Sequence, residues 1–288
     1  MVKPLTYIAI FVVLCLLLAL TPVHGIMVWD QRIIIPLTAL LFTLLVWLVS
    51  RFLNIKDSSI EIFIIAAFLL LFTPGANIFF SRDEEAIFEL ISQCIIPFFL
   101  SQYNRIRSKD FRRVYVVMLL MGIFCSFTHD GLTLPLCAAF LLDAWQRRSV
   151  VIHRACWPMM AGWFIGTALL FATRGVAHSS LESIPDRTWQ VLTLLWDAKI
   201  FIISLGLTVW LSTIQWGRHE MRHIWRRNRL IAHSLVFALC LVPFAPLGIG
   251  NAVTGVCFFS MLWTMLLLRG LERQWKARKF KNMTFSAN

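Results

Sequence analysis

The sequence has few acidic residues, no long polar segment and no cysteine spacing typical of a metal site. Only 15 of its 288 residues are Asp or Glu, and its seven cysteines form no Cys-x-x-Cys pair. No low-complexity linker or internal repeat stands out. These absences argue against zinc-ribbon sites, repeat architectures and a separate soluble domain. We therefore expect any chemistry to lie on short loops and helix ends.

Apolar residues are abundant and occur in runs long enough to cross a membrane. The mean hydropathy is +0.74, and 59% of the residues are hydrophobic. A bilayer core of about 30 Å needs about 20 apolar residues in a helix. The runs are continuous rather than alternating, which argues against strands. We predict an all-α, polytopic transmembrane bundle of about ten spans in a single domain. The predicted spans are residues 5–22, 33–53, 59–79, 86–102, 114–128, 131–145, 155–173, 188–214, 230–247 and 251–268.

The basic residues predict how these spans are oriented. The net charge is +12, and 22 of the 27 Lys and Arg residues lie on alternate loops and on the basic tail 269–288. Four lie on the opposite loops, and Lys199 lies inside a span. Lys and Arg are retained on the cytoplasmic side, so both termini are predicted to be cytoplasmic. Basic loops of this kind also contact anionic lipid head groups, and they do not indicate nucleic-acid binding.

The start of the chain resembles a secretory signal without a cleavage site. Lys3 precedes an apolar run, but no Ala-x-Ala-like site follows, and Pro22 lies where cleavage would be expected. We interpret the first span as an uncleaved signal anchor. Together with the other spans, it predicts a multi-pass membrane protein.

The predicted outer face carries seven acids against four arginines. These acids are Asp30, Asp83, Glu84, Glu85, Asp130, Glu182 and Asp186. We expect a chemical function, if there is one, on this face. Asp30 joins the first two spans at the membrane boundary, where it is a candidate general base or metal ligand near a lipid-borne substrate. A solvated loop carboxylate is the alternative.

The stretch "THDG" (128–131) places ionisable residues between two short predicted spans. Each of these spans has about 15 residues, or roughly 22 Å of helix, which is too short to cross fully. We therefore expect His129 and Asp130 to lie below the outer surface, where unpaired polar groups are costly. Gly131 allows a tight turn, and Thr128 or Asp130 can cap the following helix. A capped structural hairpin and a functional site both remain open.

Residues 122–175 resemble an uncharacterised family of bacterial polytopic membrane proteins, which implies that the chain is a multi-pass protein of the bacterial inner membrane. Members of that family carry His-Glu-Asn in the corresponding hairpin, then a basic loop, then a Gly-rich span that ends in Ala-Pro-Gly-Asn. The segment "FTPGANIFFS" (72–81) is similar to the family's Thr-Gly-x-x-Asn-Tyr segment, which maps Gly75 and Asn77 onto it.

The chain departs from this family pattern at three places. Asp130 and Gly131 replace Glu and Asn, and "ATRG" (172–175) replaces Ala-Pro-Gly-Asn. The segment "PLGIGNAVTG" (246–255) lies where an arginine is usual. The resemblance therefore allows an altered or lost family activity.

The layout of that family is similar to multi-span glycosyltransferases that take sugars from polyprenyl phosphate. This likeness implies a role in cell-surface glycan assembly, with membrane lipid and a polyprenyl-phosphate-linked sugar as partners. A transferase of this kind needs a base for the acceptor hydroxyl and a cation for the donor phosphate. Asp30 or Asp130 is the candidate base, and His129 and Arg174 are the candidates near the phosphate. A divalent cation would also offset the acids, so the cofactor remains open.

A transporter or flippase for a lipid-linked or small solute is the second reading. Asp197 and Lys199 lie near the middle of the span 188–214, where charged residues mark pathways or pair with neighbours. Their spacing of two separates them by roughly 200° around a helix, so they are not expected to pair with each other. A non-catalytic membrane scaffold is the third reading. The sequence leaves open whether the chain is an enzyme, which substrate it takes and how it assembles.

Overall fold

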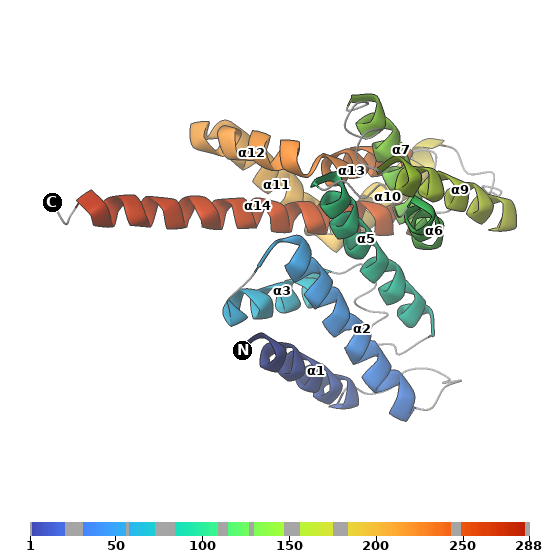
Figure 1. The fold of residues 1–288 in the computed structure, drawn as a ribbon, viewed down its shortest axis with the longest axis horizontal. Helices are drawn as coiled ribbons and strands as arrows, with labels where there is room; N and C mark the ends of the chain where they lie inside the picture. Colours follow the sequence, from blue (N-terminus) through green and yellow to red (C-terminus); the bar gives the residue numbers. More distant parts are fainter. Residues whose placement is uncertain are drawn as a thin grey trace.

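The structure is a computed structural model, and all of its described residues outside short connections are helical (Figure 1). It describes residues 2–20, 31–55, 58–72, 84–108, 115–126, 130–146, 156–174, 184–242 and 249–285. The helices are α1 (Val2–Leu20), α2 (Gln31–Phe52), α3 (Ser59–Phe72), α5 (Glu84–Ser108), α6 (Tyr115–Ser126), α7 (Asp130–Gln146), α9 (Cys156–Arg174), α10 (Ile184–Ala198), α11 (Ile200–Thr213), α12 (Gln215–Arg227), α13 (Arg229–Leu241) and α14 (Ile249–Phe285). The all-α prediction is confirmed for this part of the chain.

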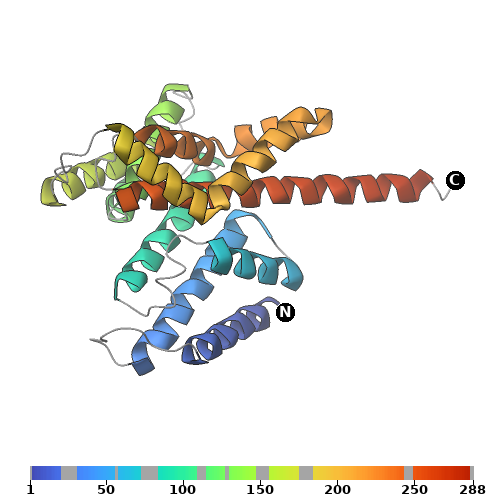
Figure 2. The same cartoon turned by 180° about the vertical axis from the view of Figure 1, so that it is seen from behind.

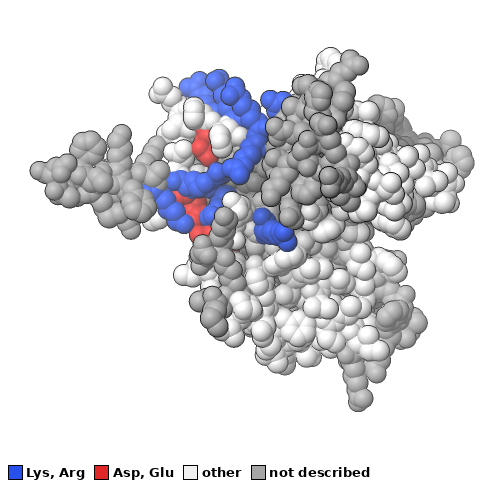
Figure 3. Space-filling view, viewed as in Figure 1, with Lys and Arg blue, Asp and Glu red and all other residues white. Residues whose placement is uncertain are grey.

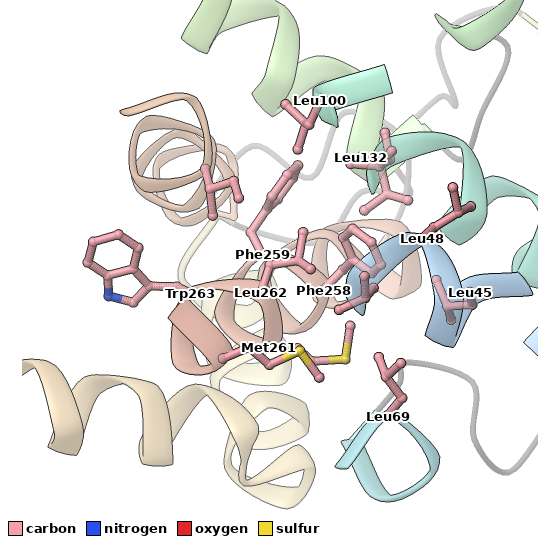
Figure 4. Packing of buried hydrophobic residues seen from close by; sticks show 14 of the residues in the cluster. Leu45, Leu48, Leu69, Leu100, Leu132, Phe258, Phe259, Met261, Leu262 and Trp263 are labelled. Atoms are coloured by element: carbon pink, nitrogen blue, oxygen red, sulfur yellow. The ribbon is translucent and has the colours of Figure 1, made fainter. Parts of the chain in front are cut away.

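The long helix α14 organises the molecule. It runs along the longest dimension, with α1, α2 and α3 on one side and α12 on the other (Figures 1 and 2). Its apolar stretch is 72% buried inside the protein, against 50% for the apolar stretches of α2 and α9. Side chains from α2, α3, α5 and α7 surround its first half in the core (Figure 4). The central helix is therefore the last one in the chain.

Three helices are long and apolar enough to cross a membrane by length and composition. They contain the stretches Ile33–Phe52, Cys156–Thr173 and Ala252–Lys276. A fourth span results if α10 and α11 are counted as one bent span. Four shorter apolar helices of 10–17 residues are also present: Pro4–Ala19, Ser59–Phe72, Tyr115–Ser126 and Arg229–Leu241. These helices support membrane association.

The described helices overlap all ten predicted spans in sequence, but only three of them, or up to four, are long and apolar enough to cross a membrane, so the number of ten is not supported. Three segments also differ from the predicted structure. The span 188–214 was predicted as one helix and is two, α10 and α11, bent by 81° at Lys199. The basic segment 218–229, predicted as a loop, forms most of helix α12 and the start of α13. Residues 269–285 of the predicted basic tail continue α14 without a break.

Hydroxyl groups inside the apolar helices bond mainly to their own backbone. Thr38, Thr43, Thr167, Thr208 and Thr264 each donate to the carbonyl four residues earlier, at 2.7–2.8 Å. A hydroxyl satisfied in this way carries no unpaired polar group into an apolar environment. These threonines are therefore compatible with a lipid-embedded helix.

Glycines bring α6 and α9 into backbone contact. A Cβ atom added at Gly122 would lie 2.3 Å from the carbonyl oxygen of Met159, and one added at Gly166 would lie 2.6 Å from that of Ile123. Gly162 and Gly166 have the four-residue spacing of small residues that lets membrane helices approach closely. The contacts advance along both helices together, so α6 and α9 run parallel.

Candidate functional site

The structure describes only part of the site predicted from the sequence. Asp30, Gly75, Asn77 and His129 lie outside the described residues. Asp130 is the first residue of α7 and Arg174 is the last residue of α9, but their side chains, like that of Asp197, are outside the described part. The proximity of Asp30, His129, Asp130 and Arg174 therefore stays a prediction.

Buried contacts hold the helices on either side of the "THDG" stretch in place. Thr133 in α7 donates to the carbonyl of Ser126, the last residue of α6, at 3.0 Å, and both residues are buried. The indole of Trp163 donates to the carbonyl of Thr133 at 3.4 Å. A Cβ at Gly255 of α14 would lie 2.2 Å from the carbonyl oxygen of Gly131. Helices α9 and α14 thus hold the two ends of this hairpin in the core.

Lys199 lies at the break between α10 and α11. Its φ of 59° and ψ of −32° interrupt the helix, and its side chain is exposed. A positive φ is rare for a residue with a side chain and carries strain. An almost wholly apolar pocket of about 380 Å³ lies at the bend and is lined by residues from both helices. The lining includes Trp189, Trp196 and Phe201.

A charged network joins α3 to α14. Arg269 donates to Glu61 at 2.7 Å, although 208 residues separate them, and each side chain is only 19% exposed. Lys276 also contacts Glu61, at 3.2 Å. Glu272 lies one helical turn from both bases and pairs with each of them. Two acids and two bases are therefore held together, with no net charge.

This charged network lies at the edge of an apolar pocket of about 370 Å³. Side chains of α3, α14 and the end of α2 line it: Leu53, Ile55, Ile64, Ile65, Phe68, Met265 and Leu268, together with Glu61, Arg269 and Glu272. Ile64, which lines the pocket, is largely exposed, so the pocket is open to the surroundings beside this residue. Its volume falls in the roughly 300–1,000 Å³ range of small-molecule sites. An apolar pocket ending on fixed charges suits an amphiphilic molecule.

A second polar pair is buried among aromatic rings. Tyr103 in α5 donates its hydroxyl to Asp143 in α7 at 3.0 Å, and both residues are fully buried. The ring of Phe140 lies 5.3 Å from that of Tyr103, and Trp163 lies 5.9 Å from Phe140, between ring centroids. A buried carboxylate is stable only when it is hydrogen-bonded or paired. This pair therefore fixes α5 against α7.

Sequence reasoning missed both polar groups, although each left a signal. Asp143 interrupts the apolar run "FLLDAW", and Glu61 interrupts "SIEIFII". Arg269, Glu272 and Lys276 have the three- and four-residue spacings of ion pairs on one helix face. Both acids lay inside predicted spans, 59–79 and 131–145, and neither was singled out as a candidate site residue, while Arg269, Glu272 and Lys276 were assigned to the basic tail.

Among the described residues, no group of three or more His, Cys, Asp or Glu side chains could hold a metal ion. Of the seven predicted outer acids, Asp30, Asp83 and Glu182 lie outside the described residues, and the side chains of Glu84, Glu85 and Asp130 are outside the described part as well. No protein family model, curated protein or solved structure matches the sequence.

Proposed function

We propose that this chain is a ten-span protein of the bacterial inner membrane that acts on a lipid-borne substrate. The pocket between α3 and α14, at the predicted cytoplasmic ends of these helices, supports the binding of a lipid, whereas the chemistry at the outer face rests on other residues. It joins an apolar lining to the Glu61–Arg269 ion pair, an arrangement that suits a molecule with a hydrocarbon part and a polar head. Its opening beside the exposed Ile64 would admit such a molecule from the surrounding lipid.

Contacts between helices support alternating spans with both termini cytoplasmic. In that topology, each contact should join residues at the same membrane side. The pairs Thr6–Ser59, Glu61–Arg269, Tyr103–Asp143 and Gln146–Arg229 all fall at predicted cytoplasmic ends, and Ser126–Thr133 and Gly131–Gly255 fall at predicted outer ends. The parallel course of α6 and α9 also fits, because the fifth and seventh spans run in the same direction.

The proposed activity is that of a glycosyltransferase-like enzyme of cell-surface glycan assembly. It would use a polyprenyl-phosphate sugar at the outer face, with Asp30 or Asp130 as base and His129 and Arg174 at the donor phosphate. Gly75 and Asn77 would bind substrate. Two observations support this proposal. The predicted outer loops have an excess of acids, and a buried hydrogen bond joins the two helices that flank the hairpin of His129 and Asp130.

Sided vesicles test this activity. Membranes containing the protein should transfer sugar from a polyprenyl-phosphate donor only when the donor reaches the outer face. Asp30→Asn or Asp130→Asn, whichever removes the base, should abolish transfer, and Arg174→Ala should weaken donor use, all at normal protein abundance. Arg51→Ala, on the predicted cytoplasmic side, is the matched control and should leave transfer unchanged. Full turnover with a nucleotide sugar at the cytoplasmic face would overturn the proposed donor and side.

A transporter or flippase is the second candidate, and the interrupted helix at Lys199 favours it. Discontinuous helices near the membrane centre form the substrate sites of many transporters. Here the 81° bend leaves Lys199 exposed beside an apolar pocket. Proteoliposomes containing a fluorescent lipid-linked sugar would test this function.

The Lys199 variants separate its charge from its backbone conformation. If the protein moves an anionic lipid-linked solute, Lys199→Arg should retain flipping, while Lys199→Gln and Lys199→Gly should lose it. Flipping by all three variants at the wild-type rate would exclude a substrate role for this charge. Loss in Lys199→Arg together with retention in Lys199→Gly would assign the role to the backbone break.

A further inference from the structure

We propose that α12 is a docking surface for the head groups of anionic phospholipids at the membrane interface. The helix has one face packed on the protein and one exposed face of basic residues. Its location beside α14 is seen in Figure 1, and basic side chains gather around it in Figure 3. This inference does not depend on the activity proposed above.

The two faces of α12 differ sharply in chemistry. The packed face consists of Gly217, Glu220 and Ile224. The residues Arg218, Arg222 and Arg226 follow one another at four-residue spacing on the opposite, exposed side, with His219 and His223 beside them. Residues at this spacing form one stripe on a helix. A basic amphipathic helix of this kind is typical of segments that lie in the membrane interface.

The acidic residue of α12 faces away from this stripe. Glu220 is 8% exposed and accepts a hydrogen bond from Gln274 of α14 at 2.9 Å. Its other oxygen lies 3.9 Å from Arg273. Because Glu220 is the only acid in the helix, its inward position leaves no carboxylate of α12 on the exposed face. The stripe therefore has the charge complementary to phosphate.

Close packing fixes the rotation of α12 about its own axis. A Cβ at Gly270 of α14 would lie 2.5 Å from the Ile224 side chain, and a Cβ at Gly217 would lie 2.4 Å from the carbonyl oxygen of Leu211. The helix cannot turn its basic stripe inward without breaking these contacts. The surface is therefore already formed before a lipid binds.

Aromatic and apolar residues beside the stripe favour a lipid surface over another polyanion. Trp225 is 38% exposed, and its ring lies 5.7 Å from that of His233 and 5.8 Å from that of Trp263, between centroids. Trp210 and Trp216 form a second ring pair where α11 meets α12. Tryptophan is enriched at the boundary between head groups and hydrocarbon. The exposed apolar side chains of α11 next to these tryptophans suit the hydrocarbon edge of a membrane and would not contribute to binding a nucleic acid.

Quenching of Trp225 by brominated lipids tests the proposal with the full chain in nanodiscs. The fluorescence of Trp225 is obtained by subtracting the fluorescence of the Trp225→Phe variant from that of the wild type. One nanodisc contains a small fraction of brominated phosphatidylglycerol in phosphatidylcholine, and the other contains the same fraction of brominated phosphatidylcholine with unlabelled phosphatidylglycerol. We expect about threefold stronger quenching by the anionic lipid at low salt, and equal quenching near 1 M salt, where the screening length is about 3 Å.

Charge-matched variants identify the stripe as the cause. The double variant Arg218→Gln/Arg222→Gln should lose most of the lipid preference, whereas Arg218→Lys/Arg222→Lys should keep it. Arg51→Gln, an exposed arginine on α2, should also keep it. Elution as a single species on size exclusion checks that each variant is folded.

Three results would overturn the proposal. One is equal quenching by both lipids at low salt. Another is a preference that persists in Arg218→Gln/Arg222→Gln. The third is loss of the preference when a single-stranded oligonucleotide is added at the same phosphate concentration as the anionic lipid, which would identify a nucleic-acid surface instead.

Discussion

A methyl group added at Gly162 would lie 2.1 Å from the backbone carbonyl oxygen of Leu119. Neither atom belongs to a flexible side chain, so the contact cannot be relieved by a rotamer change. Gly162→Ala should therefore separate α6 from α9 and destabilise the protein by about 1–3 kcal/mol. Thermal unfolding of the solubilised protein, followed by circular dichroism, measures this loss.

Gly206 supplies the control for that substitution. It is an exposed glycine inside α11, and a Cβ atom there would meet nothing within 4 Å. Gly206→Ala should leave stability unchanged or raise it by up to about 1 kcal/mol, because alanine favours the helix. Equal behaviour of the two variants would contradict the backbone contact between α6 and α9.

Removing the hydroxyl of Tyr103 should destabilise the bundle. Tyr103→Phe deprives the buried Asp143 of a hydrogen bond, at a cost of about 1–3 kcal/mol. Tyr115→Phe is a suitable comparison, because the contact of Tyr115 with Trp157 is through the rings and survives the change. The midpoint of chemical unfolding should fall for Tyr103→Phe alone. A fall of the same size in both variants would show that the Asp143 bond contributes nothing specific.

The ion pair between Glu61 and Arg269 should show measurable coupling. A double-mutant cycle with Glu61→Gln and Arg269→Gln is expected to give an interaction free energy of about 0.5–3 kcal/mol, because both side chains are mostly buried and in direct contact. The longer, more exposed pair of Arg273 with Glu220, at 3.9 Å, should give less than about 1 kcal/mol. Additive effects in the Glu61–Arg269 cycle would remove this pair as a link between α3 and α14.

Cysteine labelling should reveal whether the bent pair α10 and α11 crosses the membrane. In a cysteine-free background, Gln190→Cys should react with an impermeant reagent added outside, and His219→Cys only with reagent added inside. Both positions are exposed, so access depends on sidedness and not on packing. Labelling of both from the same side would show a re-entrant segment and would contradict the ten-span topology.

The positions of the helices could be predicted because a helix in lipid must satisfy its backbone internally, which leaves a long apolar run as a local signal. The break at Lys199 gave no such signal. The stretch "LLWDAKIFI" contains no Gly or Pro, and its conformation depends on how α10 and α11 pack. Helix α12 was missed for a different reason. Its charges were counted as a loop, although the alternation of Gly217, Glu220 and Ile224 with arginines already had helical spacing.

The candidate site was harder to predict than the fold. Asp143 and Glu61 acquire their roles from partners that lie 40 and 208 residues away, and local sequence does not determine such pairings. The predicted outer residues were chosen by charge and by resemblance. Their proximity remains a prediction, whereas the ends of the hairpin that carries His129 and Asp130 are fixed by Thr133 and Gly255.

Helix α14 has 37 residues and no break, which corresponds to about 55 Å at 1.5 Å per residue. It contacts the hairpin at Gly131 through Gly255 near one end, and Glu61 and Glu220 through Arg269 and Gln274 farther along. An unbroken helix moves as a rigid body. A small axial shift or rotation of α14 at Gly255 therefore shifts or rotates Arg269 to a similar extent. A displacement of the hairpin would then reach the charged network of Glu61 and Arg269 directly through the helix, with no diffusing messenger between them.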